Sequence, residues 1–320
     1  MAINEAFDEV TASTFANRKG TPTDNITGMN ALYNHFKKKK RITEDVSGGS
    51  RFERPVILMP NTTVGNYSGL GAHNIDEGEN FSNLNVDWSK KYMYVIISGD
   101  EMRQNKGHEK AYSLVDAKIT AGEASIANHM SAEVYSDGTV VDGMMGLQAW
   151  IQANGAGTVG GINSALYTNW QNKYLEMSGT DAWQANIRKE FNKAFLLASY
   201  NATSPDLIVA SNDVYNAYED TIQQQIRYMD SQKADGAQEN VAYKGADVIH
   251  DVNVNFAGAA ERAYMLTTKN WELCELSELK WKKQPYKTPV NADGIVIPFL
   301  WAGQQLTTSR RTNCLLLDAA

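Results

Sequence analysis

This sequence has few cysteines, no long apolar run and no net positive charge, and each of these features argues against a class of protein. Its 320 residues include two cysteines, Cys274 and Cys314, and no CxxC pair, which favours a reducing compartment over a disulfide-stabilised fold. No stretch approaches the ~18 consecutive apolar residues of a membrane span, and the first ten residues lack the apolar core of a secretory signal. The net charge of −7 argues against nucleic-acid binding through bulk electrostatics, so any such contact needs a local basic patch.

The usual patterns of catalytic and metal sites are also missing from the sequence. The five histidines are scattered without an HExxH motif, there is no GxSxG elbow, and neither cysteine lies in a catalytic signature. We therefore expect no catalytic residue, no metal ligand and no cofactor.

One glycine-rich segment partly matches a cofactor-binding motif. Residues 155–160, Gly-Ala-Gly-Thr-Val-Gly, fit the GxGxxG pattern of dinucleotide-binding proteins, which requires a strand before it, a helix after it and an acidic residue further on. Residues 150–154 form only a weak strand pattern, and the downstream Asp181 is better explained as a helix cap. A turn that needs positive φ angles explains the glycines equally well.

What the sequence does contain indicates an ordinary globular chain of the α+β class. Its composition, 42% hydrophobic and 21% charged residues, is typical of globular proteins, and the length allows one large or two modest domains. We expect one helix from about residue 180 to residue 200, and a second helix that begins after Ser211 or Asp213. Strands are expected at residues 205–210, 241–251, 263–276, 295–301 and 313–317.

An unusually long segment separates two early strand patterns. Residues 55–59 and 92–97 are short apolar runs, and residues 61–91 between them are rich in Asn and Gly. Loops beyond about 15 residues are uncommon unless they have a function, and this one carries scattered apolar residues. We expect an irregular hairpin with the two strands matched at its base.

A long amphipathic helix is expected directly afterwards, over residues 107–135. Apolar residues recur along one face of it at helical spacing, and its length would be roughly 44 Å. Gly138 supplies a left-handed stop.

Residues 1–50 have the composition of an arm, with a short helix expected over 29–36. A basic run follows that helix: Lys37, Lys38, Lys39, Lys40 and Arg41. Such a run either contacts phosphate backbones or forms a solvated face.

Several segments, in order, resemble the HK97-type major capsid proteins of tailed bacteriophages. They are residues 98–107 before the long helix, 135–138 after it, 158–162 followed by Trp170, 243–251, and 301–306 with 310–313. The resemblance covers most of the chain. It implies an N-terminal arm (1–45), an extended hairpin called the E-loop (46–104), a peripheral domain with the spine helix (105–161), an axial domain (162–261) and peripheral C-terminal strands (262–320).

The resemblance also implies a function. The chain would self-assemble into the pentamers and hexamers of an icosahedral head that encloses double-stranded DNA. It would be located in the virion and, during assembly, in the host cytoplasm. Scaffold, portal or decoration proteins would be optional partners, and no membrane would be involved. The implied intersubunit hairpin residues are Arg51, Arg54, Tyr67, Asp76, Glu77, Phe81 and Trp88. The implied axial tip residues are Asp230, Gln232, Lys233, Asp235 and Gln238, and the basic run would contact DNA or the shell interior.

One departure from the family and two alternatives remain. Some members cross-link a hairpin lysine to a neighbour's asparagine, but residues 52–89 contain no lysine here, so we expect non-covalent shells. An encapsulin-like compartment with a protein cargo is the nearest alternative function. A nucleotide-dependent enzyme, based on residues 155–160, is the alternative from another class.

Overall fold

The computed structural model describes residues 31–46, 49–69, 71, 73–75, 78, 80–104, 108–177, 182–226, 241–256, 260–289 and 291–318. The chain forms two compact units, each assembled from separate segments. Unit 1 comprises the described part of Met1–Gly48 together with Ser89–Val134 and Leu273–Gly303. Unit 2 comprises Gly49–Trp88, Tyr135–Glu272 and the described part of Gln304–Ala320.

Unit 1 combines a mixed sheet with one long helix. The strand order is β1-β12-β14-β13, and β4 also pairs with β14. Two strands cross into unit 2, because β12 begins and β14 ends there. The elements are α3 (Ala31–Lys38), β1 (Ile42–Val46), β4 (Ser89–Ser98), α4 (Gly99–Gln104), α5 (His108–Glu133), β12 (Trp271–Leu276), the 3₁₀ turn Ser277–Leu279, β13 (Lys282–Lys283) and β14 (Gly294–Thr307).

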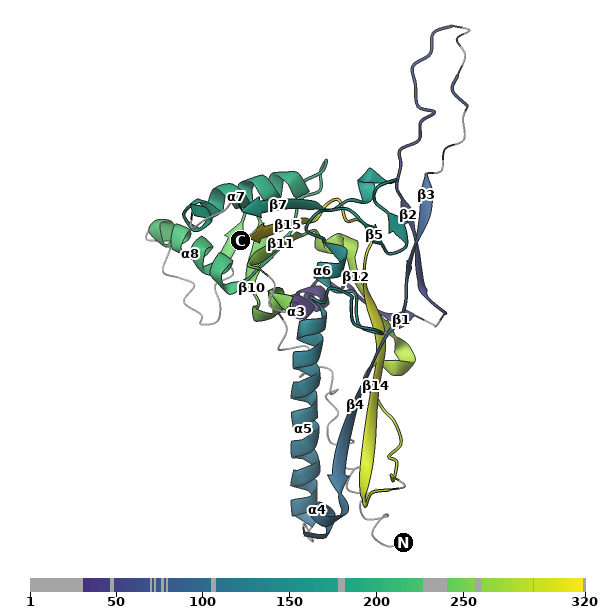
Figure 1. Ribbon diagram of the computed structural model, residues 1–320, viewed down its shortest axis with the longest axis vertical. Helices are drawn as coiled ribbons and strands as arrows, with labels where there is room; N and C mark the ends of the chain where they lie inside the picture. The colour runs from purple at the N-terminus through teal and green to yellow at the C-terminus, as the bar shows by residue number, and fades with distance from the viewer. Residues whose placement is uncertain are drawn as a thin grey trace. The chain divides into compact units, whose positions relative to one another are not determined.

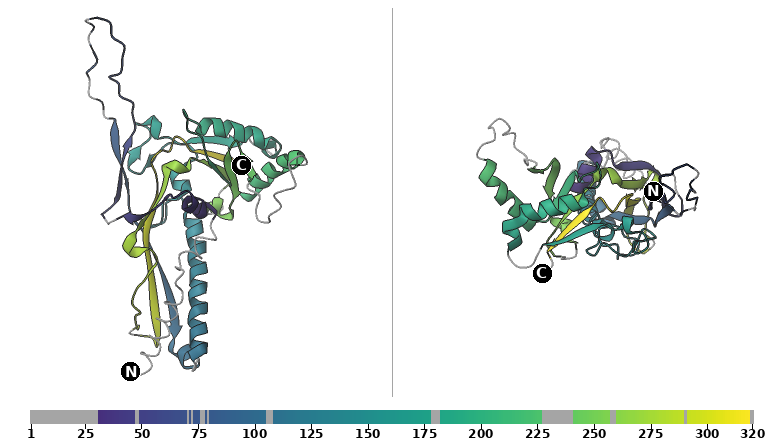
Figure 2. Two further views of the ribbon diagram at one scale, coloured as in Figure 1. Left: turned by 180° about the vertical axis from the view of Figure 1, so that it is seen from behind. Right: turned by 90° about the horizontal axis from the view of Figure 1, so that it is seen from above.

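The long helix α5 lies along β4, and both views of the ribbon show the two side by side (Figures 1 and 2). Alternate residues of β4 are buried, as expected for a strand with one covered face. Met93 and Val95 face Gly122 of α5, where a Cβ atom would lie 2.7 Å from the sulfur of Met93. The absence of a side chain at Gly122 therefore lets helix and strand approach closely.

Unit 2 is built on a six-stranded sheet of order β7-β15-β11-β8-β10-β9. Figure 1 shows α7 and α8 on one side of it. The sheet and its helices are β7 (Lys173–Met177), α7 (Ala182–Ala198), β8 (Leu207–Ala210), α8 (Asn212–Ile226), β9 (Val241–Tyr243), β10 (Ala246–His250), β11 (Arg262–Leu266) and β15 (Cys314–Asp318). The rest of the unit comprises β2 (Phe52–Ile57), β3 (Phe81–Val86), α6 (Leu147–Trp150), β5 (Thr158–Val159), β6 (Ile162–Asn163), and the 3₁₀ turns Thr168–Trp170, Val252–Val254 and Thr268–Asn270.

The core of unit 2 lies between the sheet and its two helices. Strand β8 is buried throughout and sits between β10, to which it is parallel, and β11, to which it is antiparallel. Phe191 of α7 stacks on Tyr218 of α8 with ring centroids 5.0 Å apart. Two strands of this sheet, β11 and β15, come from beyond residue 261.

The expected α+β class is confirmed, and so is the long helix, which spans His108–Glu133. Gly138 has the expected positive φ, +75°. The short helix is also present as α3, in which Leu32, Tyr33 and Phe36 are buried.

Three strand expectations are wrong in detail. The strand at residues 92–97 does not pair with the strand at 55–59: β4 pairs with β14, whereas β2 pairs with β3. The segment 241–251 is a hairpin, because Lys244 and Gly245 both take positive φ angles, +50° and +85°. The segment 263–276 is interrupted by the 3₁₀ turn Thr268–Asn270.

The glycine motif is part of a turn structure. Residues 155–160 follow α6 and include β5 of the hairpin β5–β6, instead of linking a strand to a helix. The weak strand pattern at 150–154 does not form a strand, because α6 and a turn occupy that region. This geometry does not fit a dinucleotide-binding loop.

Candidate assembly surfaces

The hairpin of β2 and β3 has one covered and one exposed face. Its ladder runs from Phe52 opposite Val86 to Ile57 opposite Phe81. Phe52, Val56, Leu84 and Val86 are buried, whereas Ile57 and Phe81, which face each other across the strands, are 70% and 71% exposed. A cross-strand apolar pair open to solvent is typical of a surface that another molecule covers.

The root of this hairpin is fixed to the turn between β5 and β6. Leu84 is fully buried, and it fills the space that a Cβ atom at Gly160 would need. The backbone N–H of Asn85 donates to the carbonyl of Gly160 at 2.9 Å. The side-chain amide of Asn169 donates to the carbonyl of Leu58 at 3.0 Å. Gly160, at φ +62°, is therefore needed to hold the hairpin.

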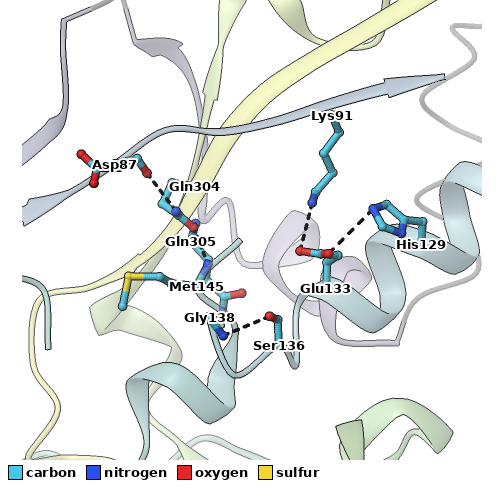
Figure 3. A network of polar contacts seen from close by, with 9 residues as sticks. All are labelled: Asp87, Lys91, His129, Glu133, Ser136, Gly138, Met145, Gln304 and Gln305. Carbon is cyan, nitrogen blue, oxygen red and sulfur yellow. Dashed lines mark hydrogen bonds and ion pairs between the residues drawn. The ribbon is translucent and has the colours of Figure 1, made fainter. Parts of the chain in front are cut away.

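Polar contacts hold the end of the hairpin where the chain returns. The Gln304 amide donates to the carbonyl of Asp87 at 3.0 Å, and its oxygen accepts the backbone N–H of Met145 at 2.9 Å (Figure 3). The Asp87 carboxylate pairs with Arg51 at 2.8 Å. The indole of Trp88 donates to the carbonyl of Gly49 at 2.9 Å.

The hairpin residues expected at an interface therefore divide into two groups. Arg51, Arg54 and Trp88 make contacts at the root, Arg54 with Glu272 at 3.6 Å. Tyr67 and Phe81 are exposed, and Val64 and Ile75 near the tip are more than four-fifths exposed. Asp76 and Glu77 lie outside the described residues.

Unit 1 carries a second exposed apolar surface, on β4. Tyr92, Tyr94 and Ile96 are exposed on the face of the strand opposite the one that meets α5. Their cross-strand partners on β14 include Pro298 and Leu300. Tyr92, Tyr94 and Ile96 thus form a continuous apolar stripe, unlike the scattered single apolar residues that are normal on a protein surface.

The basic run begins in the last turn of α3. The side chains of Lys38, Lys39 and Lys40 are exposed, and Lys40 has φ +56°. Lys37 lies in α3, and Arg41 leads into β1, which pairs with β12 in parallel. Residues 31–46 are thus part of unit 1. The axial tip residues Asp230, Gln232, Lys233, Asp235 and Gln238 lie outside the described residues.

A buried ion pair joins β4 to the end of α5. The Lys91 ammonium lies 2.9 Å from the Glu133 carboxylate, with both side chains less than a tenth exposed (Figure 3). The other Glu133 oxygen lies 3.8 Å from Nε2 of His129. Burial, and then the charge of Lys91, lower the pKa of His129, while Glu133 opposes this shift. The imidazole of His129 therefore favours its neutral form more than the imidazole of a free histidine does.

The described residues carry neither a candidate metal site nor a candidate membrane span. Across these residues, His, Cys, Asp and Glu side chains do not gather into a group that could hold a metal ion. No helix among them has the length and apolar character that a bilayer span requires.

Sequence reasoning missed the residues that anchor the hairpin. Leu84 was not singled out, although the alternation of Leu84 and Val86 marks a half-buried strand. Gly160 and Gln304 appeared only as members of the segments 155–160 and 301–306, without a role in the hairpin. Gln304 gave no local signal, since its role depends on two segments more than a hundred residues away.

Comparison with known proteins identifies this fold. No protein-family model and no curated sequence matches the chain. The capsid of cyanophage A-1(L) is 15% identical with a TM-score of 0.59, and the match covers 88% of this chain and 92% of that one. The capsid of Myoviridae phage XM1 is 8% identical with a TM-score of 0.56, covering 88% and 91%.

A third solved structure is an encapsulin complex. The holo-SrpI encapsulin complex from Synechococcus elongatus PCC 7942 is 7% identical with a TM-score of 0.52, and the match covers 88% of this chain and 86% of that one. At such identities the likeness concerns the fold alone. The chain has the HK97-type capsid fold that the sequence resemblance implied.

Proposed function

We propose that this chain is the major capsid protein of a tailed bacteriophage, with a structural and not a catalytic role. It assembles into the pentamers and hexamers of an icosahedral head. The observation that carries this proposal is the hairpin of β2 and β3, which is anchored at its root through Leu84 and exposes apolar side chains beyond it. An isolated subunit gains nothing from such exposure, whereas a shell subunit buries it against a neighbour.

In this proposal the hairpin lies over an adjacent copy of the chain. The exposed pair Ile57 and Phe81 supplies one apolar surface, and the stripe Tyr92, Tyr94 and Ile96 on β4 is a surface of matching chemistry. The N-terminal arm (1–45), the hairpin (46–104), the axial domain (162–261) and the peripheral parts (105–161 and 262–320) keep these boundaries as part of the same proposal. The contacts are head-to-tail, and such contacts close into rings when the rotation between copies allows it.

The enclosed cargo in this proposal is double-stranded DNA, contacted without sequence preference. The exposed side chains of Lys38, Lys39 and Lys40 favour this reading on a chain that is otherwise acidic. Each phosphate contact adds about 0.9 to the slope of log affinity against log salt. Replacing Lys37–Lys40 with Gln should flatten the salt dependence of DNA binding by the disassembled subunit. An unchanged slope would assign the run to a solvated face or to a neighbour's carboxylates.

An encapsulin-like compartment is the second candidate, because an encapsulin shares the fold. Negative-stain microscopy of the purified protein tests whether shells form. The contents of the shells then distinguish a phage capsid from an encapsulin-like compartment. Nuclease-protected DNA in particles from infected cells supports the capsid reading. Particles filled with one protein species support the compartment, and a chain that remains monomeric under all conditions contradicts both.

A further inference from the structure

Helix α3 of unit 1 ends in a hydrogen-bonded turn that contains the exposed lysines (Figure 1). The backbone N–H of Lys39 donates to the carbonyl of His35 at 2.9 Å, and that of Arg41 donates to the carbonyl of Phe36 at 2.8 Å. The second bond closes around Lys40, which has φ +56°. This is the Schellman arrangement, in which one left-handed residue ends a helix.

The left-handed position of this turn is occupied by an unusual residue. Glycine is the usual choice at such a helix end, and asparagine is the commonest replacement, because other side chains crowd the backbone there. The helix dipole favours cations at this end, but Lys38 and Lys39 already supply them. Lys40 thus opposes the local backbone preference, and natural sequences make such departures mainly where function requires them.

Helix α3 is fixed to the sheet of unit 1 through a buried carboxylate. Glu275 of β12, which is 2% exposed, accepts the hydroxyl of the buried Tyr33 at 3.4 Å. The same carboxylate oxygen accepts the indole N–H of Trp301 on β14 at 3.1 Å. The Lys280 ammonium lies 3.7 Å from the other oxygen. Glu275 therefore ties the helix that carries the lysines to two strands.

The chain is also held on the other side of the turn. The carbonyl of Arg41 accepts the backbone N–H of Leu273 at 2.9 Å. Ile42 and Thr43 of β1 then pair with Leu273 and Cys274 of β12, the strand that carries Glu275. One strand therefore fixes the backbone before and after the turn, so that the lysine side chains start from a defined backbone.

We infer that Lys38, Lys39 and Lys40 form a preformed turn that contacts phosphate groups, and that Glu275 is its positioning residue. This inference rests on the proposed contact with double-stranded DNA and names the residues that make and support it. A preformed site loses less conformational entropy on binding than a mobile one. The anchors therefore raise affinity without adding a phosphate contact, whereas each lysine contributes to the salt dependence of binding.

Lys40→Gly separates binding from folding. Full-length subunits are titrated into a short labelled DNA duplex at several salt concentrations. The variant should reduce the slope of log affinity against log salt by about 0.9, the value of one phosphate contact. Its urea midpoint of unfolding should equal or exceed that of wild type, because glycine suits the left-handed backbone. Lys287→Gln removes one exposed charge from another segment and, as the control, should keep the wild-type slope.

Tyr33→Phe tests the positioning role of Glu275. It keeps the buried ring and removes only the hydroxyl that Glu275 accepts. Affinity for the duplex should fall about two- to tenfold, the equivalent of one hydrogen bond, and the salt slope should not change, because the same lysines make the contacts. Amide hydrogen exchange at Lys39 and Arg41 should become faster. Glu275→Gln keeps an oxygen for Tyr33, so it should bind more tightly than Glu275→Leu at the same slope.

A wild-type salt slope in Lys40→Gly would overturn the inference, and the charge would then belong to solvent or to the chain's own Glu44 or Asp45 in β1. A lower urea midpoint in Lys40→Gly, or wild-type affinity in Tyr33→Phe, would overturn it as well. In these cases duplex binding by the wild-type subunit still supports the proposed function. A wild-type subunit that binds no duplex would instead contradict the proposed DNA contact itself.

Discussion

Leu84 of the hairpin occupies the space in which a Cβ atom at Gly160 would stand. Gly160 also accepts the backbone N–H of Asn85 and has a φ of +62°. One glycine therefore fixes the root of the segment that we propose to join subunits.

Gly160→Ala should destabilise the protein by about 2–5 kcal/mol, because the overlap of the added methyl group with Leu84 (about 1–3 kcal/mol) adds to the cost of a left-handed backbone (about 1–2 kcal/mol). Gly245→Ala is the control, since Gly245 has φ +85° but open space around its Cβ position, so only the backbone cost of about 1–2 kcal/mol applies. Urea unfolding measures the loss of unfolding free energy in both variants, provided that the dependence of this free energy on urea concentration is the same. Equal losses in the two variants would contradict the proposed packing of Leu84.

Lys91→Met should cost about 3–5 kcal/mol, because it leaves the buried Glu133 carboxylate without its cation. The double variant Lys91→Met with Glu133→Leu should recover most of this loss, since it removes both charges. Lys118→Met, which breaks the more exposed pair with Glu101, should have a smaller effect. A single variant at Lys91 as stable as wild type would refute the importance of the buried pair.

The His129 environment predicts a pH dependence with a definite sign. Because its pKa is lower in the folded chain, the unfolded chain binds more protons as pH falls through the ordinary histidine pKa of about 6.5. The contribution of His129 to stability is therefore complete above that pH and declines below it. In Lys91→Met, NMR titration should show the pKa of His129 rising, since a repelling charge is gone. An unchanged or lower value would contradict the assigned cause.

Assembled shells should separate completely under denaturing, reducing electrophoresis and give one band near 35.4 kDa. The reason is that residues 52–89 offer no lysine for a hairpin isopeptide bond. The cysteines are not expected to link subunits either, because Cys274 and Cys314 are both buried and burial raises the pKa of Cys314 to about 12. A ladder of multimers would show that another cross-link exists.

Local signals in the sequence predicted the elements with a strong period. Helix α5 and strand β8 were predicted because their apolar residues repeat or run together over enough length. The hairpin β9–β10 was missed because its turn begins with Lys244 instead of the usual Asn or Asp.

Long-range pairing was the part that could not be predicted. Strand β3 is largely polar, with Leu84 and Val86 as its buried residues, so the more apolar strand β4 was taken as the partner of β2. The choice depends on β14, which lies some two hundred residues further on and pairs with β4 over its whole length. Likewise the glycines of residues 155–160 resemble a cofactor motif until Leu84 is placed beside Gly160.

Negative-stain microscopy of three chains side by side tests the central claim most directly. They are wild type, a variant in which a Gly-Ser-Gly linker replaces residues 61–78, and Ile57→Ser with Phe81→Ser. The shortened chain keeps Leu84 and the β2–β3 ladder, so it should fold. We predict closed shells for wild type, and folded, soluble subunits without closed shells for both variants. Normal shells from the shortened chain would contradict the account.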